Sequence, residues 1–418
     1  MKLFVLNLLM VSNLLNVLFC KIKSNDHSIP PKIKTIIFKS YNQNSALPVL
    51  VGNEILKLSF DDLTANENDY YYKISYHNSD WSESNLFKNE YLIGIDNIRI
   101  SEFENSFNTL KRYTNYKLEI PNNSIQLKLS GNYMLHVYDS NNKLQFSRKF
   151  LYLKPKIEVK GNVFRTRNLD FFLTHQNIKF ELIQSKVGYI QNPSENLKIV
   201  IIQNDQWFNQ ITDLKPQFKE NRILKYRYDI SSSFEAGNEY LFFDTKDLRI
   251  NGMNTSFIDL EEIYQVYLYT DIPRKYTPYT FSQDLNGDFE IRTLLGSQKS
   301  DIEADYSWVY FTLAASTELP ETKIYVLGNF NNYEPTEHSL MIYNKSLEAY
   351  EAKILLKQGF YNYKYVAKTL SGWNLNLISG NFYQTDNNYK ILVYYRPPGE
   401  IYDQLIGFGE LNSKNILN

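Results

Sequence analysis

Short runs of alternating apolar and polar residues follow one another along almost the whole chain, and this pattern most restricts its fold. Typical runs are KIKTIIFKSY at 32–41, NYMLHVYDS at 132–140 and IKFELIQS at 178–185. They are rich in β-branched and aromatic residues, and clusters of Asn, Asp, Ser and Gly separate them, as in strands joined by turns. No segment keeps a sustained apolar period of three to four residues, so we predict an all-β fold.

The length of the chain indicates several domains, because 418 residues are too many for one β-sandwich. Seven strand-like runs before Lys154 and Pro155 predict a first β-sandwich. A second series of runs follows, and the polar stretch LGSQKSDIEAD separates it from a third. We therefore predict three consecutive immunoglobulin-like β-sandwich domains. The expected divisions are a signal peptide at 1–20, sandwiches at 28–155, 156–294 and 306–398, a linker at 295–305 and a C-terminal tail at 399–418.

The first twenty residues predict export. Lys2 precedes the apolar run LFVLNLLMVSNLLNVLF, which several polar residues interrupt and which is short for a membrane span. A cleaved secretory signal peptide is the favoured interpretation. Cys20 offers lipidation as the alternative, but Leu18 and Phe19 are poor neighbours for a lipidated cysteine. If cleavage follows Cys20, the mature chain has no cysteine and forms no disulfide.

Charge and hydropathy argue against a nucleic-acid partner and against a membrane span in the mature chain. The formal net charge is −1, and no basic patch or stripe marks the sequence, so we expect no nucleic-acid partner. After the first twenty residues no second long apolar run occurs, and we expect no transmembrane segment in the mature chain.

Candidate reactive sites are few. The five histidines show no metal-ligand spacing, and no nucleophile elbow or phosphate-binding loop is present. Asp284, Asn286 and Asp288 match the first ligand positions of a calcium loop, but Phe289 replaces the required Gly and Leu295 the required Glu. The Asn-Gly pair within this stretch favours a turn. We predict no catalytic, cofactor-binding or metal-binding residues; a pair of carboxylates for glycoside hydrolysis is neither supported nor excluded.

One stretch suggests a carbohydrate site. KIYVLGNFNNYEP at 323–335 and LKQGFYNYKYVA at 356–367 resemble the glycogen- and starch-binding modules of the early-set immunoglobulin-like group. The resemblance implies two aromatic platforms and a lysine, at Tyr333, Trp373 and Lys364, and a glucan as ligand. Sugar rings stack on exposed aromatic faces, which gives this interpretation its physical basis.

The alternative for the same stretch is purely structural. Phe330 would anchor the turn, and Tyr361, Tyr363 and Tyr365 would lie on one face of a strand at period two. Many domains share such a fold without binding sugar.

Phrases along the chain, taken in order, resemble the plug protein family of the type IX secretion system of Bacteroidetes. The phrases are LSFDDL (58–63), YYYKISYHNSDW (70–81), YLIG (91–94), SFNT (106–109), SGNYMLHVYD (130–139), THQNIKFEL (174–182), IIQNDQWFN (201–209), AGNEYLFFD (236–244), PETKIYVLGNFNNY (320–333), LKQGFYNYKYV (356–366), GNFYQTDNNYKILVYYR (380–396) and DQLIGF (403–408). One departure is Asn78, where the family usually has Cys.

The resemblance implies a non-enzymatic periplasmic protein, peripherally associated with the outer membrane. Its partner would be the large outer-membrane β-barrel of the type IX translocon, and it would seal the periplasmic opening when no cargo is engaged. A wide barrel lumen is polar and water-filled, so a plug has to block it by bulk and complementary contacts. The residues that contact the barrel are not predicted.

Overall fold

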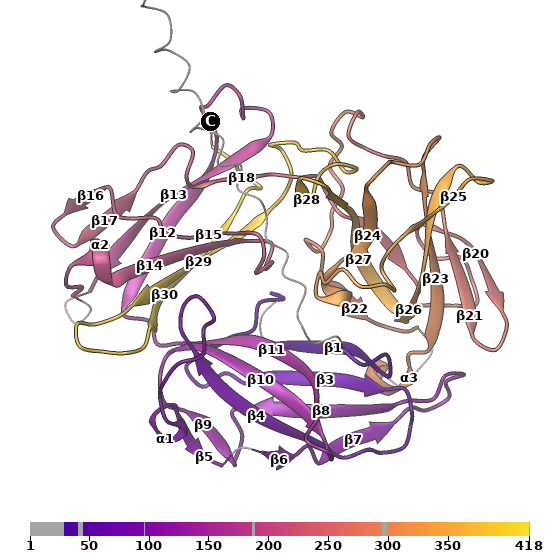
Figure 1. Ribbon diagram of the computed structural model, residues 1–418, viewed down its shortest axis with the longest axis horizontal. Coiled ribbons are helices and arrows are strands. Elements are labelled where there is room, and N and C mark those ends of the chain that lie inside the picture. Colours follow the sequence, from indigo (N-terminus) through magenta and orange to yellow (C-terminus); the bar gives the residue numbers. More distant parts are fainter. Residues whose placement is uncertain (1–28, 41–44, 96, 186–188, 295–298, 418) are drawn as a thin grey trace, which may run out of the picture.

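The computed structural model describes residues 29–40, 45–95, 97–185, 189–294 and 299–417. The predicted signal peptide at 1–20, with Cys20, lies outside these residues. The chain forms three lobes arranged as a triangle, each built from packed β-sheets (Figure 1). The prediction of an all-β sandwich fold is confirmed.

The first lobe is a sandwich of two antiparallel-rich sheets. One sheet has the order β1-β3-β8-β7 and the other β2-β11-β10-β4-β6, with a small ribbon of β5 and β9. The strands are β1 (Ile33–Ser40), β2 (Val49–Val51), β3 (Leu56–Asp62), β4 (Tyr70–His77), β5 (Leu92–Gly94), β6 (Ile98–Arg99), β7 (Glu102–Asn105), β8 (Thr114–Ile120), β9 (Ile125–Leu127), β10 (Gly131–Asp139) and β11 (Leu144–Leu153). In β4 the alternation buries Tyr70, Tyr72, Ile74 and Tyr76 in the core, as its period of two predicts.

The second lobe combines two segments that are distant in sequence. Its sheets have the orders β12-β13-β17-β16, with β18 on β13, and β15-β14-β29-β30. The strands are β12 (Ile157–Arg165), β13 (His175–Gln184), β14 (Leu197–Gln203), β15 (Gln210–Ile211), β16 (Phe218–Glu220), β17 (Ile223–Tyr226), β18 (Ser233–Glu235), β29 (Asn388–Tyr395) and β30 (Gln404–Asn412). β14 is buried along almost its whole length. On one edge it pairs with β29 over that whole length, from Leu197↔Tyr395 to Gln203↔Tyr389, and on the other edge it pairs briefly with β15.

The third lobe contains the strands between these two segments. Its sheets have the orders β19-β27-β22, with β24 and β28 on β27, and β20-β21-β23-β26-β25. The strands are β19 (Leu241–Asp244), β20 (Thr255–Leu260), β21 (Tyr264–Leu268), β22 (Phe289–Ile291), β23 (Tyr306–Ala314), β24 (Lys323–Leu327), β25 (Ile342–Asn344), β26 (Ala349–Lys357), β27 (Gly359–Thr369) and β28 (Gly372–Asn374).

The three sandwiches are therefore not consecutive, and the expected ranges 156–294, 306–398 and 399–418 do not follow the sheets. Strands β19 to β22, expected in the second domain, belong to the third lobe, whereas β29 and β30 return to the second. Figure 1 shows this return as yellow strands beside the magenta β14. Local sequence patterns identify a strand such as β14, but they do not identify the strand, almost 200 residues away, with which it pairs.

Helices are short in the described residues. They are α1 (Lys88–Tyr91), α2 (Pro193–Asn196), α3 (Ser300–Glu303) and a 3₁₀ turn, η1 (Asn329–Asn331). α3 falls within the expected linker 295–305, and its Ile302 accepts a main-chain hydrogen bond from Phe107 of the first lobe. This part of the linker is thus docked on the first lobe.

Strand β30 lies unusually close to β12, and glycine permits the approach. A Cβ on Gly409 would lie 2.6 Å from Cγ1 and 2.9 Å from Cβ of Val159. We expect Gly409→Val to lower the free energy of unfolding by about 1–3 kcal/mol, because the backbone has to shift to admit the side chain. Urea unfolding measures the change.

The matched control is the double variant Gly409→Val with Val159→Ala, which removes Cγ1, the nearer of the two close atoms. It is expected to recover part of the loss. Equal stability of Gly409→Val and the parent chain would contradict this packing.

Candidate functional site

The first and third lobes meet around a buried ion pair. Lys357 Nζ of β26 donates a hydrogen bond to Asp61 Oδ2 of β3 at 2.7 Å, and the side chains are 1% and 0% exposed. Tyr306 donates to the same carboxylate oxygen at 2.6 Å and Asn115 to the other at 2.7 Å. Burial raises the pKa of Asp61 and lowers that of Lys357, while their mutual attraction opposes both shifts. Removing either partner would leave a buried charge, so the pair ties the lobes together.

A second contact between these lobes uses the residues next to α3. The carboxylate of Asp305 accepts main-chain hydrogen bonds from Leu110 at 2.8 Å and Lys111 at 3.2 Å. The hydroxyl of Tyr113 donates to the main-chain oxygen of Ala304 at 2.8 Å. A loop of the first lobe is thereby fixed against the start of β23.

The first and second lobes share a buried carboxylate, Asp403. It accepts hydrogen bonds from Ser79 N and Oγ at 3.0 and 2.8 Å, from Arg396 Nε at 2.8 Å and from Lys198 Nζ at 3.2 Å. Burial alone would raise the pKa of Asp403, but the hydrogen bonds from Arg396 and Ser79 outweigh it and hold the pKa below its usual value. Tyr76 donates to the main-chain oxygen of the same residue at 2.6 Å.

The stretch HNSDW, which carries part of the family resemblance, lies at this interface. Asn78, the departure from the family pattern, accepts a hydrogen bond from Arg396 Nη2 at 3.1 Å and one from Asn132 at its main-chain oxygen. His77 contacts Trp81 O and Ser75 Oγ through its two ring nitrogens at 2.9 and 2.8 Å. Burial lowers the pKa of His77, which favours a neutral structural histidine.

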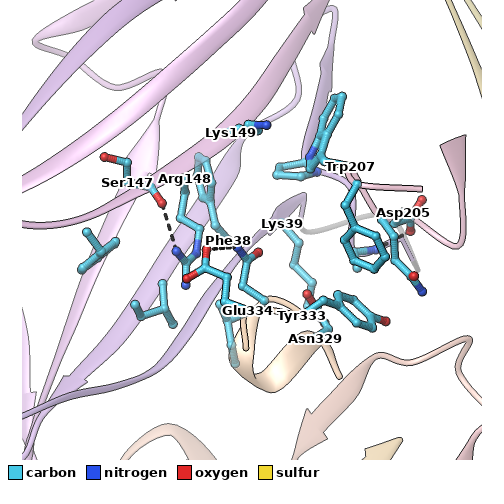
Figure 2. Close-up of a pocket in the computed structure, with 18 of the residues that line it drawn as sticks. Phe38, Lys39, Ser147, Arg148, Lys149, Asp205, Trp207, Asn329, Tyr333 and Glu334 are labelled. Atoms are coloured by element: carbon cyan, nitrogen blue, oxygen red, sulfur yellow. Dashed lines mark hydrogen bonds between the residues drawn. The ribbon is translucent and has the colours of Figure 1, made fainter. Parts of the chain in front are cut away.

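A cavity of about 620 Å³ lies where the three lobes meet. Its walls come from β1 and β11 of the first lobe, from the loop after β14 of the second, and from η1 and the start of β22 of the third. Figure 2 shows labelled side chains from all three lobes around it.

Three of the phrases that carry the family resemblance meet at this cavity. Trp81 and Trp207 pack edge to face with ring centres 4.8 Å apart, and Lys149 Nζ lies 4.6 and 5.2 Å from their centres. Tyr333, from the third phrase, lines the opposite side. Residues far apart in sequence therefore build one site between the lobes.

The three residues expected to bind sugar do not form an exposed platform. Tyr333 is 7% exposed and packs against Phe208 of the second lobe with ring centres 5.8 Å apart. Lys364 is 8% exposed, its Nζ 5.4 Å from the ring centre of Tyr240. Trp373 is only partly exposed. Since a sugar ring stacks on an open aromatic face, burial of Tyr333 and Lys364 argues against a glucan site there.

The calcium-like stretch forms a turn, as the Asn-Gly pair predicts. Asn286 and Gly287 have φ of 53° and 92°, and Gly287 leaves no room for a Cβ beside the hydroxyl of Tyr333. Asp284 accepts a hydrogen bond from the main chain of Asn286 at 2.7 Å, and Asp288 accepts one from a neighbouring side chain. Across the described ranges, no group of three or more His, Cys, Asp or Glu is placed to hold a metal ion.

An acidic cluster lies where the chain passes from the second lobe to the third. Glu239 is 1% exposed; its carboxylate accepts hydrogen bonds from the hydroxyl of Tyr279 and from the main chain of Asp386. Burial raises its pKa to about 7, and the nearby carboxylates of Asp284 and Asp386 act in the same direction. Burial raises the pKa of Asp284 to about 6.

Sequence reasoning did not single out Asp61, Lys357 and Asp403, although all three lie in phrases that carry the family resemblance. An isolated charge in or beside a strand-like run looks like a solvent-facing position. Asp61 and Lys357 are buried together only because the first and third lobes pack against each other.

Comparison with known proteins supports one family. Residues 33–154 match the family described as type 9 secretion system plug protein 1st domain, and these residues coincide with the first lobe. A crystal structure of a hypothetical protein from Parabacteroides merdae is 34% identical, with a TM-score of 0.88 over 92% of this chain and 98% of that one. A comparison with curated proteins found no match. In the part of the chain with described coordinates, no helix has the length and apolar character to cross a membrane.

We expect Lys357→Met to lower the free energy of unfolding by about 3–5 kcal/mol, because Asp61 is left buried without its counter-charge. Urea unfolding followed by tryptophan fluorescence measures the loss. Lys353→Met, on the exposed face of the same strand, is the matched control and should cost far less.

The double variant Asp61→Asn with Lys357→Met removes both charges and is expected to recover most of the stability. If Lys357→Met were as stable as the Lys353→Met control, the ion pair would not hold the lobes together.

Stability should fall as pH rises through the titration of Glu239. Its folded-state pKa of about 7 exceeds its ordinary value, so the native state holds the proton more tightly and is favoured at lower pH. Glu239→Gln should reduce the loss of stability between about pH 5 and pH 8, by on the order of 1–3 kcal/mol. Thermal unfolding across this range measures it, with exposed Glu290→Gln as control. An unchanged pH profile in Glu239→Gln would refute the assignment.

Proposed function

Because this chain belongs to the type 9 secretion system plug protein family, we propose that it is a non-enzymatic periplasmic plug subunit. It docks on the outer-membrane barrel of the translocon and seals the periplasmic opening when no cargo is engaged. The family is one of secretion-system plug domains and not a known enzyme family.

Beyond the family itself, the observation that supports this proposal is that buried ion pairs and hydrogen bonds hold the three lobes in a triangle. A plug blocks a wide aqueous lumen by bulk, so it has to resist deformation under contact. Asp61 with Lys357 joins the first lobe to the third, and Asp403 with Arg396 and Ser79 joins the first to the second. The second and third lobes are joined by the chain itself, which passes between them twice.

Docking also needs a contact surface, and each lobe offers exposed aromatic side chains. Phe107 of the first lobe is 67% exposed, Phe218 of the second 54% and Phe257 of the third 49%. Aromatic residues are enriched at the centres of protein interfaces. Each lobe thus carries one of these exposed aromatic side chains.

The first test is affinity purification. We expect the chain, tagged at its C-terminus and extracted from native-host membranes in mild detergent, to co-purify with a very large outer-membrane barrel as the main species. The same preparation from cells with an untagged chain is the control. Recovery of the tagged protein alone would contradict the proposal.

The second test identifies the docking face. In a Cys20→Ser background, Phe107→Cys, Phe218→Cys and Phe257→Cys each provide a single thiol on one lobe. After treatment of native membranes with a thiol-to-amine crosslinker, one position is expected to crosslink to the barrel in clearly greater yield than the other two. Absence of a barrel adduct at all three positions, with the barrel present in the membranes, would exclude docking through these faces.

A further inference from the structure

The cavity between the lobes has the dimensions and walls of a small-molecule site. Its volume of about 620 Å³ falls within the range of about 300–1,000 Å³ typical of such sites. Its apolar surface comes from aromatic side chains of all three lobes: Phe38, Phe146, Trp207, Phe208, Phe289 and Tyr333. Such walls bind an apolar body, and a few polar groups would orient it.

One charged group in the cavity has most of its hydrogen-bonding capacity unused. Arg148, on β11, donates from Nη1 to the main-chain oxygen of Ser147 at 2.9 Å, and among the described residues it has no ion pair within 4.0 Å. A guanidinium carries five N–H donors in a planar fork. Glu334, on the third lobe, also lines the cavity and interacts electrostatically with Arg148. Figure 2 shows both residues among the labelled side chains of the cavity.

The pKa of Arg148 is consistent with an unsatisfied cation. Burial lowers the pKa of the guanidinium, and the charge of Glu334 opposes that shift without restoring the usual value. A bound anion would compensate for the lost hydration.

Other charged groups of the cavity have contacts within the protein. Asp205 Oδ2 accepts hydrogen bonds from Ser45 Oγ and Ala46 N at 3.0 and 3.1 Å, whereas its Oδ1 is buried without a hydrogen-bond partner among the described residues. Glu334 accepts one from Asn332 Nδ2 at 2.8 Å. Asp288 and Asp80 each accept side-chain hydrogen bonds, and Lys149 lies over two tryptophan rings. With Lys39, on the same lobe, the lining carries three basic side chains.

We propose that this cavity binds a small amphiphile with one anionic group, such as an aromatic or short fatty carboxylate. The anion pairs with the guanidinium of Arg148, and the apolar body packs against the aromatic walls. This inference concerns the cavity alone and does not depend on docking to a barrel.

Two dyes with the same ring system test it: 8-anilino-1-naphthalenesulfonate and its uncharged analogue N-phenyl-1-naphthylamine. We expect the full chain to bind the sulfonate more tightly than the amine in a fluorescence titration. Because Trp81 and Trp207 line the cavity, we expect energy transfer from tryptophan to bound dye, and the Arg148 variants report the location. Arg148→Gln should weaken sulfonate binding at least about tenfold, the loss expected for one charge-assisted hydrogen bond, and leave amine binding unchanged.

Arg99→Gln is the matched control, because this arginine is exposed on the same lobe and far from the cavity lining. Arg148→Lys retains the charge and should bind the sulfonate better than Arg148→Gln. Equal affinity of the parent chain for the two dyes would overturn the proposal without any variant. Equal sulfonate affinity of folded Arg148→Gln and Arg99→Gln would overturn it as well, since the dye would then be bound elsewhere.

Discussion

The arrangement of the three lobes depends on the buried ion pair of Asp61 and Lys357. Two charges removed from water are tolerated only where each is paired and hydrogen-bonded, and here Tyr306 and Asn115 supply the additional bonds. The pair does not merely add stability. It requires the first and third lobes to meet in one geometry, because any displacement would leave a buried charge without its partner.

The second and third lobes are held together independently of this ion pair, by the path of the chain. The chain leaves the second lobe after β18, builds the third lobe, and returns as β29 and β30 to complete the second. The second and third lobes are thus connected twice, and the first lobe joins both through Asp403 and the Asp61 pair. A closed triangle results, and the cavity lies where its three lobes meet.

Residues from separate phrases of the family resemblance come together where the three lobes meet. Trp81, Trp207 and Tyr333 come from three separate phrases of the resemblance and from three lobes, yet all line the central cavity. Residues expected to present a sugar platform instead pack between lobes, because Tyr333 faces Phe208 of the second lobe. The tyrosine-rich strands serve internal packing: Tyr361, Tyr363 and Tyr365 are all buried.

Much of the local structure follows from the amino-acid sequence alone. Period-two alternation specifies strands such as β4 and β13, and Asn286 with Gly287 specifies a turn through backbone angles that few other residues tolerate. Ordered phrases were enough to identify the family. The folded structure was needed to show that β14 pairs with β29, that Lys357 meets Asp61, and that Arg148 lines a cavity. These depend on which distant strands become neighbours, and alternation carries no information on the identity of a partner strand.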